Sequence, residues 1–563
     1  MKANLHEFSQ IHNKNCRLDP GKRGKSQVFD KAVSLFVQAI VYHYFATTDF
    51  ACMNLQNTRL YSTGSKPPEA LKQSFRNLME PLLVLFNKAA GMVLKNKQFY
   101  IAYSIPGGVY GYFKNHSVSS NELEAIAGRI RKMIKQRESF RHEVLPPEKI
   151  LRYFEANQRK DVIHLLKSKN FETEPEGLRL AHLNGFGELL LNHIQKNYNR
   201  LERFRLIPFH KGFFLIADPD FFDRVMPPKS ETSKYFHGFE ETEETMMHLG
   251  VGSFAELNDI IRQGRLPEFI KLSEAWQARR ISIIAENIVS RPDNPRLVFL
   301  AGPTSSGKTT SANRLAIELK VMKKEVLILS LDNYYLPHTA IPDDPATGIK
   351  NFEQITALNL ELFRKEISKL LDGKEVHLSR YHFDGRGATP DEKPTKISPD
   401  TYIIVEGIHG LNPELWEKTM ENPSYRLYVS ALSTLNIHDH LPLSTSDHRL
   451  IRRLVRDHLF RGYSFNETIR RWPDVMQNEY HSIFPFQESA HAIFNSALIY
   501  ELAVFAHYAP AIANPEKAEN EQIREEVKRL NRILSLLIPI NPLDIPPTSI
   551  LREFIGGSSF QYS

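Results

Sequence analysis

One short run, residues 297–320, constrains the fold more than any other stretch of this sequence. Leu297 to Ala301 is apolar and predicts a buried parallel strand, and Ser311 to Lys320 predicts an amphipathic helix. Between them lies Gly-x-x-x-x-Gly-Lys-Thr, a spacing that lets backbone N–H groups surround phosphates at a helix N-terminus. The alternative is a turn that binds nothing, but the flanking strand and helix favour a phosphate-binding loop. Its residues are Gly302, Pro303, Thr304, Ser305, Ser306, Gly307, Lys308, Thr309 and Thr310.

Two side chains of this loop have distinct expected tasks. Lys308 can reach the β- and γ-phosphates of a nucleoside triphosphate, and the Thr309 hydroxyl can bind Mg²⁺. The expected cofactors are therefore ATP and Mg²⁺.

From residue 297 onward, apolar strands alternate with helical segments. Further strands are predicted at residues 325–331, 402–405 and 425–429, and helices at 356–371 and 447–461. This alternation predicts an α/β fold with a doubly wound parallel sheet, whose ligands bind at the C-terminal ends of the strands. Asp332 and Glu406 stand at two such ends, so we expect both to lie beside the phosphate-binding loop.

Composition excludes several classes of protein. The 563 residues carry a net charge of +7, which suits an anionic nucleotide but only weakly favours nucleic acid, so no nucleic-acid partner is expected. The two cysteines, Cys16 and Cys52, form neither a metal motif nor a disulfide framework, which predicts a reducing cytoplasm. No run of 18 apolar residues occurs and the N-terminus lacks a signal-like apolar core, so no membrane association is expected.

The pattern before residue 292 differs, since helices are mixed with short strands. Residues 70–95 predict a helix, and Phe99 to Ile105 and Gly108 to Phe113 predict strands paired around Pro106-Gly107. We divide the chain into a partly helical extension (1–69), an α+β domain (70–228), a helical connector (229–291), an α/β domain that contains the phosphate-binding loop (292–510), and a C-terminal helix and tail (511–563).

Phosphoryl transfer needs a phosphate cradle, a metal, an acceptor hydroxyl held in line, and cations around the transferred group. Asp332 could orient or deprotonate the hydroxyl, or merely cap a turn. Glu406 could hold Mg²⁺, or be exposed in a turn. The arginines of the 447–461 helix, which include Arg453, Arg456 and Arg461, could close over phosphates as a lid. They could also form a solvated basic face or a nucleic-acid patch.

Several motifs together resemble the uridine kinase/phosphoribulokinase family. They are GPTSSGKTT, LSLDNYY, NFE, YHF, VEGIHGLNP, VSALSTLNIHDH, RLIRRLVRDHLFRGYS and FPFQESA. The chain is most similar to long bacterial nucleoside kinases described as uridine kinase-like, in which a region resembling threonyl-tRNA synthetase accessory and editing domains precedes the kinase. The resemblance runs from about residue 70 to the C-terminal SILREFIGGSSF.

The resemblance implies a role for each matching position. Asp332 corresponds to the catalytic carboxylate, Tyr335 to its neighbouring tyrosine, and Glu353 to an aspartate that contacts ribose hydroxyls. Tyr381 and Phe383 correspond to the aromatic pair that contacts the base, and Arg386 is loosely aligned with a histidine. Glu406 corresponds to the metal-associated acid, and Arg453, Arg456 and Arg461 to the lid arginines.

Two departures from the family pattern put uridine in doubt as the substrate. Tyr463 stands where a second arginine follows the lid Arg-Gly, and Arg471 stands where a polar amide is usual. We expect a kinase that phosphorylates the 5′-hydroxyl of a nucleoside, uridine or cytidine. The alternatives are a kinase of another small hydroxylated metabolite, such as a sugar phosphate, and an ATP-switched RNA-binding protein. The sequence leaves the oligomeric state open, a homo-oligomer included.

Overall fold

The computed structural model describes residues 74–561, without residues 139, 170–177, 192–197, 226–232, 344–349, 351–352, 383–386 and 417–422. Residues 67–563 form one compact unit, to which all the described residues belong. The predicted partly helical extension, 1–69, lies outside the described residues. The domain boundaries drawn above stay a prediction.

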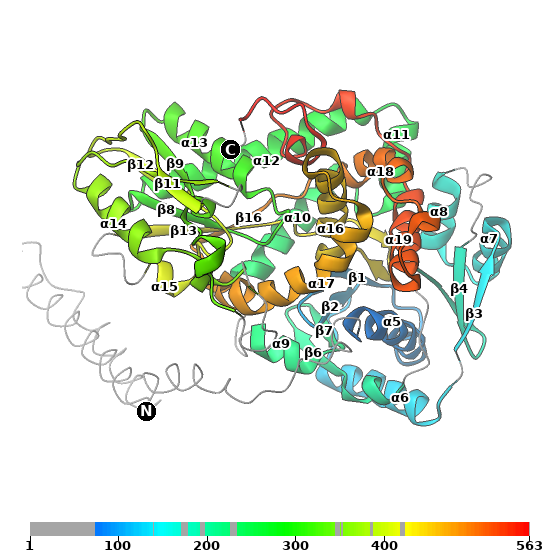
Figure 1. The fold of residues 1–563 in the computed structure, drawn as a ribbon. Helices are drawn as coiled ribbons and strands as arrows, with labels where there is room; N and C mark the ends of the chain where they lie inside the picture. The colour runs from blue at the N-terminus through cyan, green and yellow to red at the C-terminus, as the bar shows by residue number, and fades with distance from the viewer. Residues whose placement is uncertain are drawn as a thin grey trace, which may run out of the picture. The chain divides into compact units, whose positions relative to one another are not determined.

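A five-stranded parallel sheet forms the centre of the C-terminal half (Figure 1, green to orange). Its order is β16-β13-β8-β12-β9, so β8, the strand before the phosphate-binding loop, is the middle strand. All four strands predicted for this region exist, with ends within one residue of the prediction, whereas β16 was not predicted. The strands are β8 (Leu297–Ala301), β9 (Val326–Ser330), β12 (Tyr402–Glu406), β13 (Ser424–Ser430) and β16 (Ala492–Asn495).

Helices cover both faces of this sheet, as the predicted doubly wound fold requires. Val298 and Leu300 of β8 pack in one core cluster with residues of α13 (Lys308–Val321). Leu297 and Phe299 pack in another with residues of α14 (Leu360–Leu371). Successive side chains of a strand point to opposite faces, so a continuous apolar strand feeds two cores.

Two predicted helices differ from the structure in detail. The helix expected from residue 356 begins at Leu360, because the Asn359 side chain accepts a hydrogen bond from Leu362 N–H (3.0 Å) and caps the first turn. The helix expected over 447–461 is α16 (Thr445–Arg456), and a π-helical turn, Asp457–Arg461, completes it.

The N-terminal part of the described chain contains two antiparallel sheets. The first has the order β1-β2-β7-β6, and its β1 (Phe99–Ile105) and β2 (Gly108–Phe113) have the predicted bounds. The second is β3-β4-β5. The likeness of this part to synthetase accessory domains stays a prediction. The remaining elements are α5 (Ser74–Val93), α6 (Ser120–Lys135), β3 (Phe140–Leu145), α7 (Pro147–Ala156), α8 (Lys160–Ser168), β4 (Leu178–Leu183), β5 (Phe186–Leu190), β6 (Arg205–Phe209), β7 (Gly212–Ile216) and α9 (Pro219–Val225).

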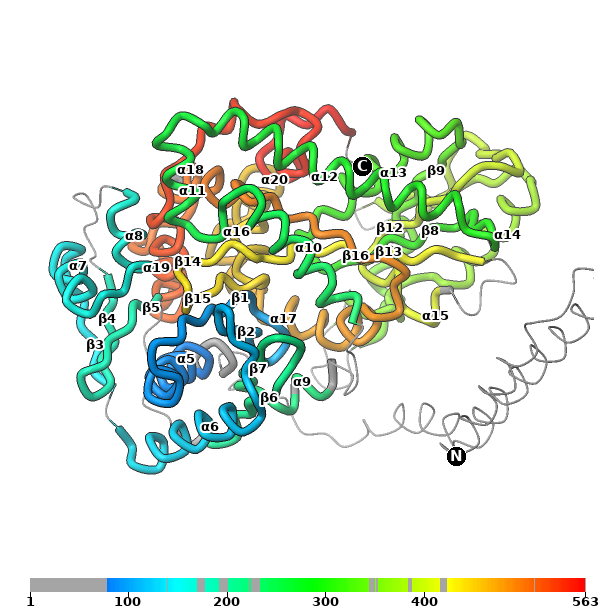
Figure 2. Tube along the Cα trace, turned by 180° about the vertical axis from the view of Figure 1, so that it is seen from behind, coloured from blue at the N-terminus to red at the C-terminus, as the bar shows by residue number. Residues whose placement is uncertain are grey.

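Three helices lead from this part to the parallel sheet: α10 (Lys234–Leu249), α11 (Phe254–Arg262) and α12 (Leu266–Val289). The last of them packs against α13 before the chain enters β8 (Figure 2). Beyond the sheet, the chain forms α17 (Phe465–Ser482), α18 (Glu501–Ile512), α19 (Glu521–Ser535) and α20 (Arg552–Ile555). In Figure 2 the red C-terminal segment returns with α20 to the side of α16. No helix in the described part of the chain is long and apolar enough to cross a membrane.

Candidate active site

The phosphate-binding loop connects the middle strand of the sheet to α13, as predicted. A Cβ at Gly302 would lie 2.0 Å from the Val429 carbonyl oxygen of the neighbouring strand, so only glycine fits there. Gly307, with φ +80°, takes the left-handed conformation that starts the helix at Lys308. The two glycines of the motif therefore stand at the two positions where the loop backbone requires glycine.

Two buried ion pairs hold the loop from behind. Arg449 donates to Thr304 O (2.9 Å) and to the Glu479 carboxylate, and Glu479 in turn accepts from Thr304 N–H (2.9 Å). One turn later, Arg452 donates to Ser305 O (3.3 Å) and is paired with Glu501 (2.6 Å). These two arginines of α16 are thus structural supports of the loop.

A cavity of about 1160 Å³ opens in front of the loop. Its lining brings together most of the side chains that the sequence singled out, namely Thr304, Ser305, Gly307, Lys308, Thr309, Asp332, Tyr335, Glu353, Tyr381, Glu406, Arg453, Arg456 and Arg461. Gly302, Pro303, Ser306 and Thr310 belong to the same loop without lining the cavity. Phe383 and Arg386 lie outside the described residues.

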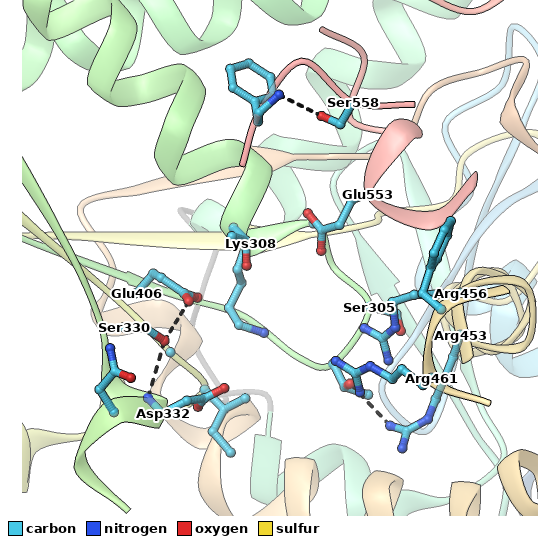
Figure 3. Close-up of a pocket in the computed structure, with 18 of the residues that line it drawn as sticks. Ser305, Lys308, Ser330, Asp332, Glu406, Arg453, Arg456, Arg461, Glu553 and Ser558 are labelled. Carbon is cyan, nitrogen blue, oxygen red and sulfur yellow. Dashed lines mark hydrogen bonds between the residues drawn. The ribbon is translucent and has the colours of Figure 1, made fainter. Parts of the chain in front are cut away.

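The two carboxylates expected at strand ends lie close together on one side of Lys308 (Figure 3). Ser330 links the Glu406 carboxylate to the backbone of Asp332, because its hydroxyl donates to Glu406 Oε1 (2.9 Å) and accepts from Asp332 N–H (3.4 Å). Burial and the nearby Asp332 raise the pKa of Glu406 to about 7. Asp332 lines the cavity, and desolvation by the surrounding protein raises its pKa above the usual value. The positive charges of Lys308 and Arg461 act in the opposite direction. Both acids therefore lie where a metal ion or another cation would stabilise their charged forms.

The cavity is also lined by Glu353 and two tyrosines, the residues for which the resemblance implies contact with the acceptor. Burial raises the pKa of Glu353, and the charge of Glu479 adds to this effect. The rings of Tyr335 and Tyr381 meet edge to face, with centroids 5.9 Å apart. Asn333 fixes the second of them by accepting a hydrogen bond from Tyr381 N–H (3.2 Å). A carboxylate beside two aromatic rings suits a ligand with vicinal hydroxyls and a flat base.

The three predicted lid arginines converge on Asp457, at the junction of α16 and the π-helical turn. Their distances to its carboxylate are 3.2 Å for Arg453, 3.0 Å for Arg456 and 3.9 Å for Arg461. Burial lowers the pKa of Arg456, and the charge of Arg461 lowers it further. Three cations share one buried acid, so they leave excess positive charge facing the cavity. By contrast, Tyr463 and Arg471 do not line the cavity, and the Arg471 guanidinium lies over the Tyr463 ring at 4.8 Å.

Sequence reasoning missed part of this site. Asn333, Arg380 and His382 line the cavity beside residues of the recognised motifs, so their sequence positions could have indicated them. The C-terminal segment also lines it, through Arg552, Glu553, Gly556, Gly557, Ser558 and Phe560. The family resemblance includes this segment as SILREFIGGSSF but gives it no role, because it follows the last kinase motif by more than fifty residues and no spacing in the sequence connects it to the loop.

The loop fits a triphosphate by its unused polar groups. The Ser305 hydroxyl belongs to a residue that lines the cavity and finds no hydrogen-bond partner among the described residues, so it remains able to donate to an anion. The described residues contain no group of three His, Cys, Asp or Glu side chains that could hold a metal alone. Magnesium commonly binds through one or two protein ligands together with substrate phosphates, and Thr309 and Glu406, the two predicted ligands, both line the cavity.

Comparisons with known proteins point to the same part of the chain. Residues 297–502 match the model of the Phosphoribulokinase / Uridine kinase family. A uridine kinase from Saccharomyces cerevisiae is 28% identical over 281 residues, which are 48% of this chain and 52% of the yeast protein. One from Lactobacillus helveticus is 27% identical over 193 residues, 34% of this chain and 82% of that protein. The chain thus spans about half the length of the yeast relative and most of the bacterial one.

A solved structure described as a possible uridine kinase from Bacillus stearothermophilus is 19% identical, covers 27% of this chain and 79% of that chain, and has a TM-score of 0.22. The fold assignment depends on the sheet order and the family match instead. Residues 297–502 therefore resemble the phosphoribulokinase/uridine kinase family, and the order of the parallel sheet around β8 agrees with the predicted α/β fold.

Proposed function

We propose that this protein transfers the γ-phosphate of ATP to the 5′-hydroxyl of a nucleoside, with uridine or cytidine as the acceptor. The observation that carries this proposal is one cavity that joins the loop lysine, two carboxylates at neighbouring strand ends and three arginines. The uridine kinase relatives support a nucleoside as acceptor. Protein of this kind would act in the cytoplasm.

Each group has a definite place in the proposed reaction. Asp332 accepts the proton of the acceptor hydroxyl while the hydroxyl oxygen bonds to the γ-phosphorus. At the same time the bond between that phosphorus and the oxygen that bridges it to the β-phosphate breaks. Lys308 and the lid arginines Arg453, Arg456 and Arg461 stabilise the charge that develops on the phosphoryl oxygens. Thr309 and Glu406 would hold Mg²⁺, which when bound neutralises phosphate charge. Glu353, Tyr335 and Tyr381 orient the nucleoside.

An acceptor panel tests this proposal. Purified full-length protein is given ATP, Mg²⁺ and either a nucleoside or a sugar, and ADP release and phosphorylated product are both measured. We expect uridine or cytidine to be phosphorylated at O5′. No product with any hydroxyl acceptor, in protein that still binds ATP, would refute the kinase proposal.

A second candidate acceptor is a small hydroxylated metabolite that already carries an anionic group. Arg380 and His382, on either side of Tyr381, both line the cavity and could meet such a group. Sugar phosphates belong in the same panel for this reason. Phosphorylation of a sugar phosphate in preference to every nucleoside would favour this candidate.

A further inference from the structure

The C-terminal segment is built into the site. The Ile550 side chain lies so close to the loop that a Cβ on Gly307 would be 2.6 Å from its Cδ1 atom. The Arg452 guanidinium lies 4.8 Å from the ring centre of Phe554, which is buried. These contacts hold the segment against the loop.

Arg552 and two glycines fix the turn that follows α20. The Arg552 side chain donates to Pro542 O (3.1 Å), to Gly556 O (3.2 Å) and to the Ile545 carbonyl. Gly556 and Gly557 have φ angles of +81° and +72°, and a Cβ at Gly556 would meet the Phe460 ring at 2.7 Å. Phe460 belongs to the π-helical turn of the lid, so the tail and the lid meet at the edge of the cavity.

Glu553 makes the most informative contact. Its Oε2 atom accepts hydrogen bonds from Thr310 N–H (3.1 Å) and from the Thr310 hydroxyl (2.6 Å). Thr310 lies in the first turn of α13, where free backbone N–H groups and the helix dipole favour an anion. The Glu553 carboxylate therefore occupies a place suited to a phosphate.

The direction of the donor follows from the positions of these charges. Asp332 and Glu406 lie on one side of Lys308, and Glu553 lies on the other (Figure 3). In a loop of this kind the lysine reaches the β- and γ-phosphates, while backbone N–H groups contact the α- and β-phosphates. A triphosphate whose γ-phosphate lies near Asp332 consequently directs its α-phosphate to Thr310 and its nucleoside to the C-terminal segment.

We propose that residues 552–560 form the wall of the donor site that contacts the nucleoside of ATP, and that the α-phosphate replaces the Glu553 carboxylate on Thr310. This inference depends on the proposed function only in taking a nucleoside triphosphate as the donor. Phe560 lines the cavity as an aromatic face for the base. Its N–H donates to the Ser558 hydroxyl (3.1 Å; dashed in Figure 3), which holds both residues in one turn.

Binding measurements without any acceptor test the inference. Isothermal titration of the full-length protein with ATP and with inorganic tripolyphosphate, both with Mg²⁺, separates the nucleoside from the phosphates. Phe560→Ala is expected to weaken ATP binding about tenfold, the loss of one stacking face, and to leave tripolyphosphate binding unchanged. Glu553→Gln is expected to tighten the binding of both ligands about fivefold, because no negative charge then competes for Thr310.

The control is Leu543→Ala, a substitution in the same C-terminal region at a side chain that is 84% exposed and does not line the cavity; it should change neither affinity. If Phe560→Ala and Glu553→Gln bind ATP as the wild type does, while Lys308→Ala binds it poorly, the proposal that residues 552–560 contact the nucleoside (the tail assignment) is overturned. The kinase proposal then stands. If the variants shift as expected but no acceptor is phosphorylated, the tail assignment stands and the kinase proposal fails. A wild-type protein that binds no ATP overturns both.

Discussion

Asp332 is the residue that we propose accepts the proton of the acceptor hydroxyl. Its carboxylate lines the cavity beside Lys308 and takes no part in the two ion pairs that support the loop. Asp332→Asn keeps the shape but removes the proton acceptor, so kcat should fall about 10²- to 10⁴-fold while the dissociation constant for ATP changes little. Single-turnover kinetics and titration calorimetry measure the two quantities. Asp372→Asn, at an exposed site at the end of α14, is the matched control. Normal turnover in Asp332→Asn would show that Asp332 is not the proton acceptor.

A substitution of Lys308 tests how the loop handles the phosphates of ATP. Its ammonium donates to Pro303 O (3.2 Å) across the loop and would reach phosphate from the same position. Lys308→Ala should lower kcat/KM for ATP by at least about 10²-fold, because a positioned cation in a partly enclosed site stabilises the transferred charge. Lys320→Ala, at the exposed end of the same helix, should leave kcat/KM unchanged. Equal kcat/KM values for the two variants would contradict the role of the loop lysine.

The sequence predicted the side chains of this site that belong to local motifs. Asp332 and Glu406 could be placed because each follows a strand directly, and parallel strands end at one edge of the sheet. Glu553 could not be placed, since it contacts a residue 243 positions away through the packing of the C-terminal segment. The roles of the predicted site residues stay predictions until variants are measured.

The same distinction holds for whole elements. Buried strands such as β8 and β12 are continuous apolar runs and were predicted to within a residue, but β16 has only four residues, Ala492–Asn495, and lacks such a run. The arginines of α16 differ in a way that their spacing in the sequence does not indicate. Arg453 lines the cavity, whereas Arg449 is buried behind the loop with Glu479, because tertiary packing decides which arginine meets an acid.

Helix α16 supports the loop through a buried ion pair that should respond to pH. Arg452 and His448 hold the Glu501 pKa at about 2, below its usual value, although burial opposes this. The stability that a lowered carboxylate pKa contributes is present above the unfolded-state value, near 4.5, and is lost as the pH falls toward 2. Unfolding free energy measured by urea titration should therefore fall through this range, beyond what other acids cause.

Glu501→Gln identifies that contribution. The variant leaves Arg452 buried without its carboxylate, so we expect a loss of about 3–5 kcal/mol at neutral pH and a shallower decline below pH 4.5 than in the wild type. Glu516→Gln, at an exposed site before α19, is the control and should match the wild type at both pH values. An acid profile in Glu501→Gln that parallels the wild type would assign the decline to other groups.

On the scale of the whole described unit, one buried asparagine connects parts of the chain that are far apart in sequence. Asn258, in α11, is 0% exposed. Its amide group donates to the Ser168 hydroxyl (3.0 Å) and to Leu536 O (2.9 Å), and its carbonyl accepts from Ile538 N–H (2.8 Å). It thus joins α8, α11 and the stretch of chain that follows α19, and residues of all three belong to one hydrophobic core cluster that extends from Met79 to Ile555. These parts should therefore unfold together.

Asn258→Leu tests that coupling. The variant keeps the volume but leaves the Ile538 N–H and the Leu536 carbonyl buried without partners, and each such group costs about 1–3 kcal/mol. We expect differential scanning calorimetry to show a single transition at a lower temperature, with loss of ATP binding in step with it, because the chain that Asn258 holds at Leu536 and Ile538 continues directly to the C-terminal segment at the cavity. Asn287→Leu, at an exposed site on α12, should melt as the wild type does. A second transition that stays at the wild-type temperature would mean that the kinase domain is stable without its N-terminal partner.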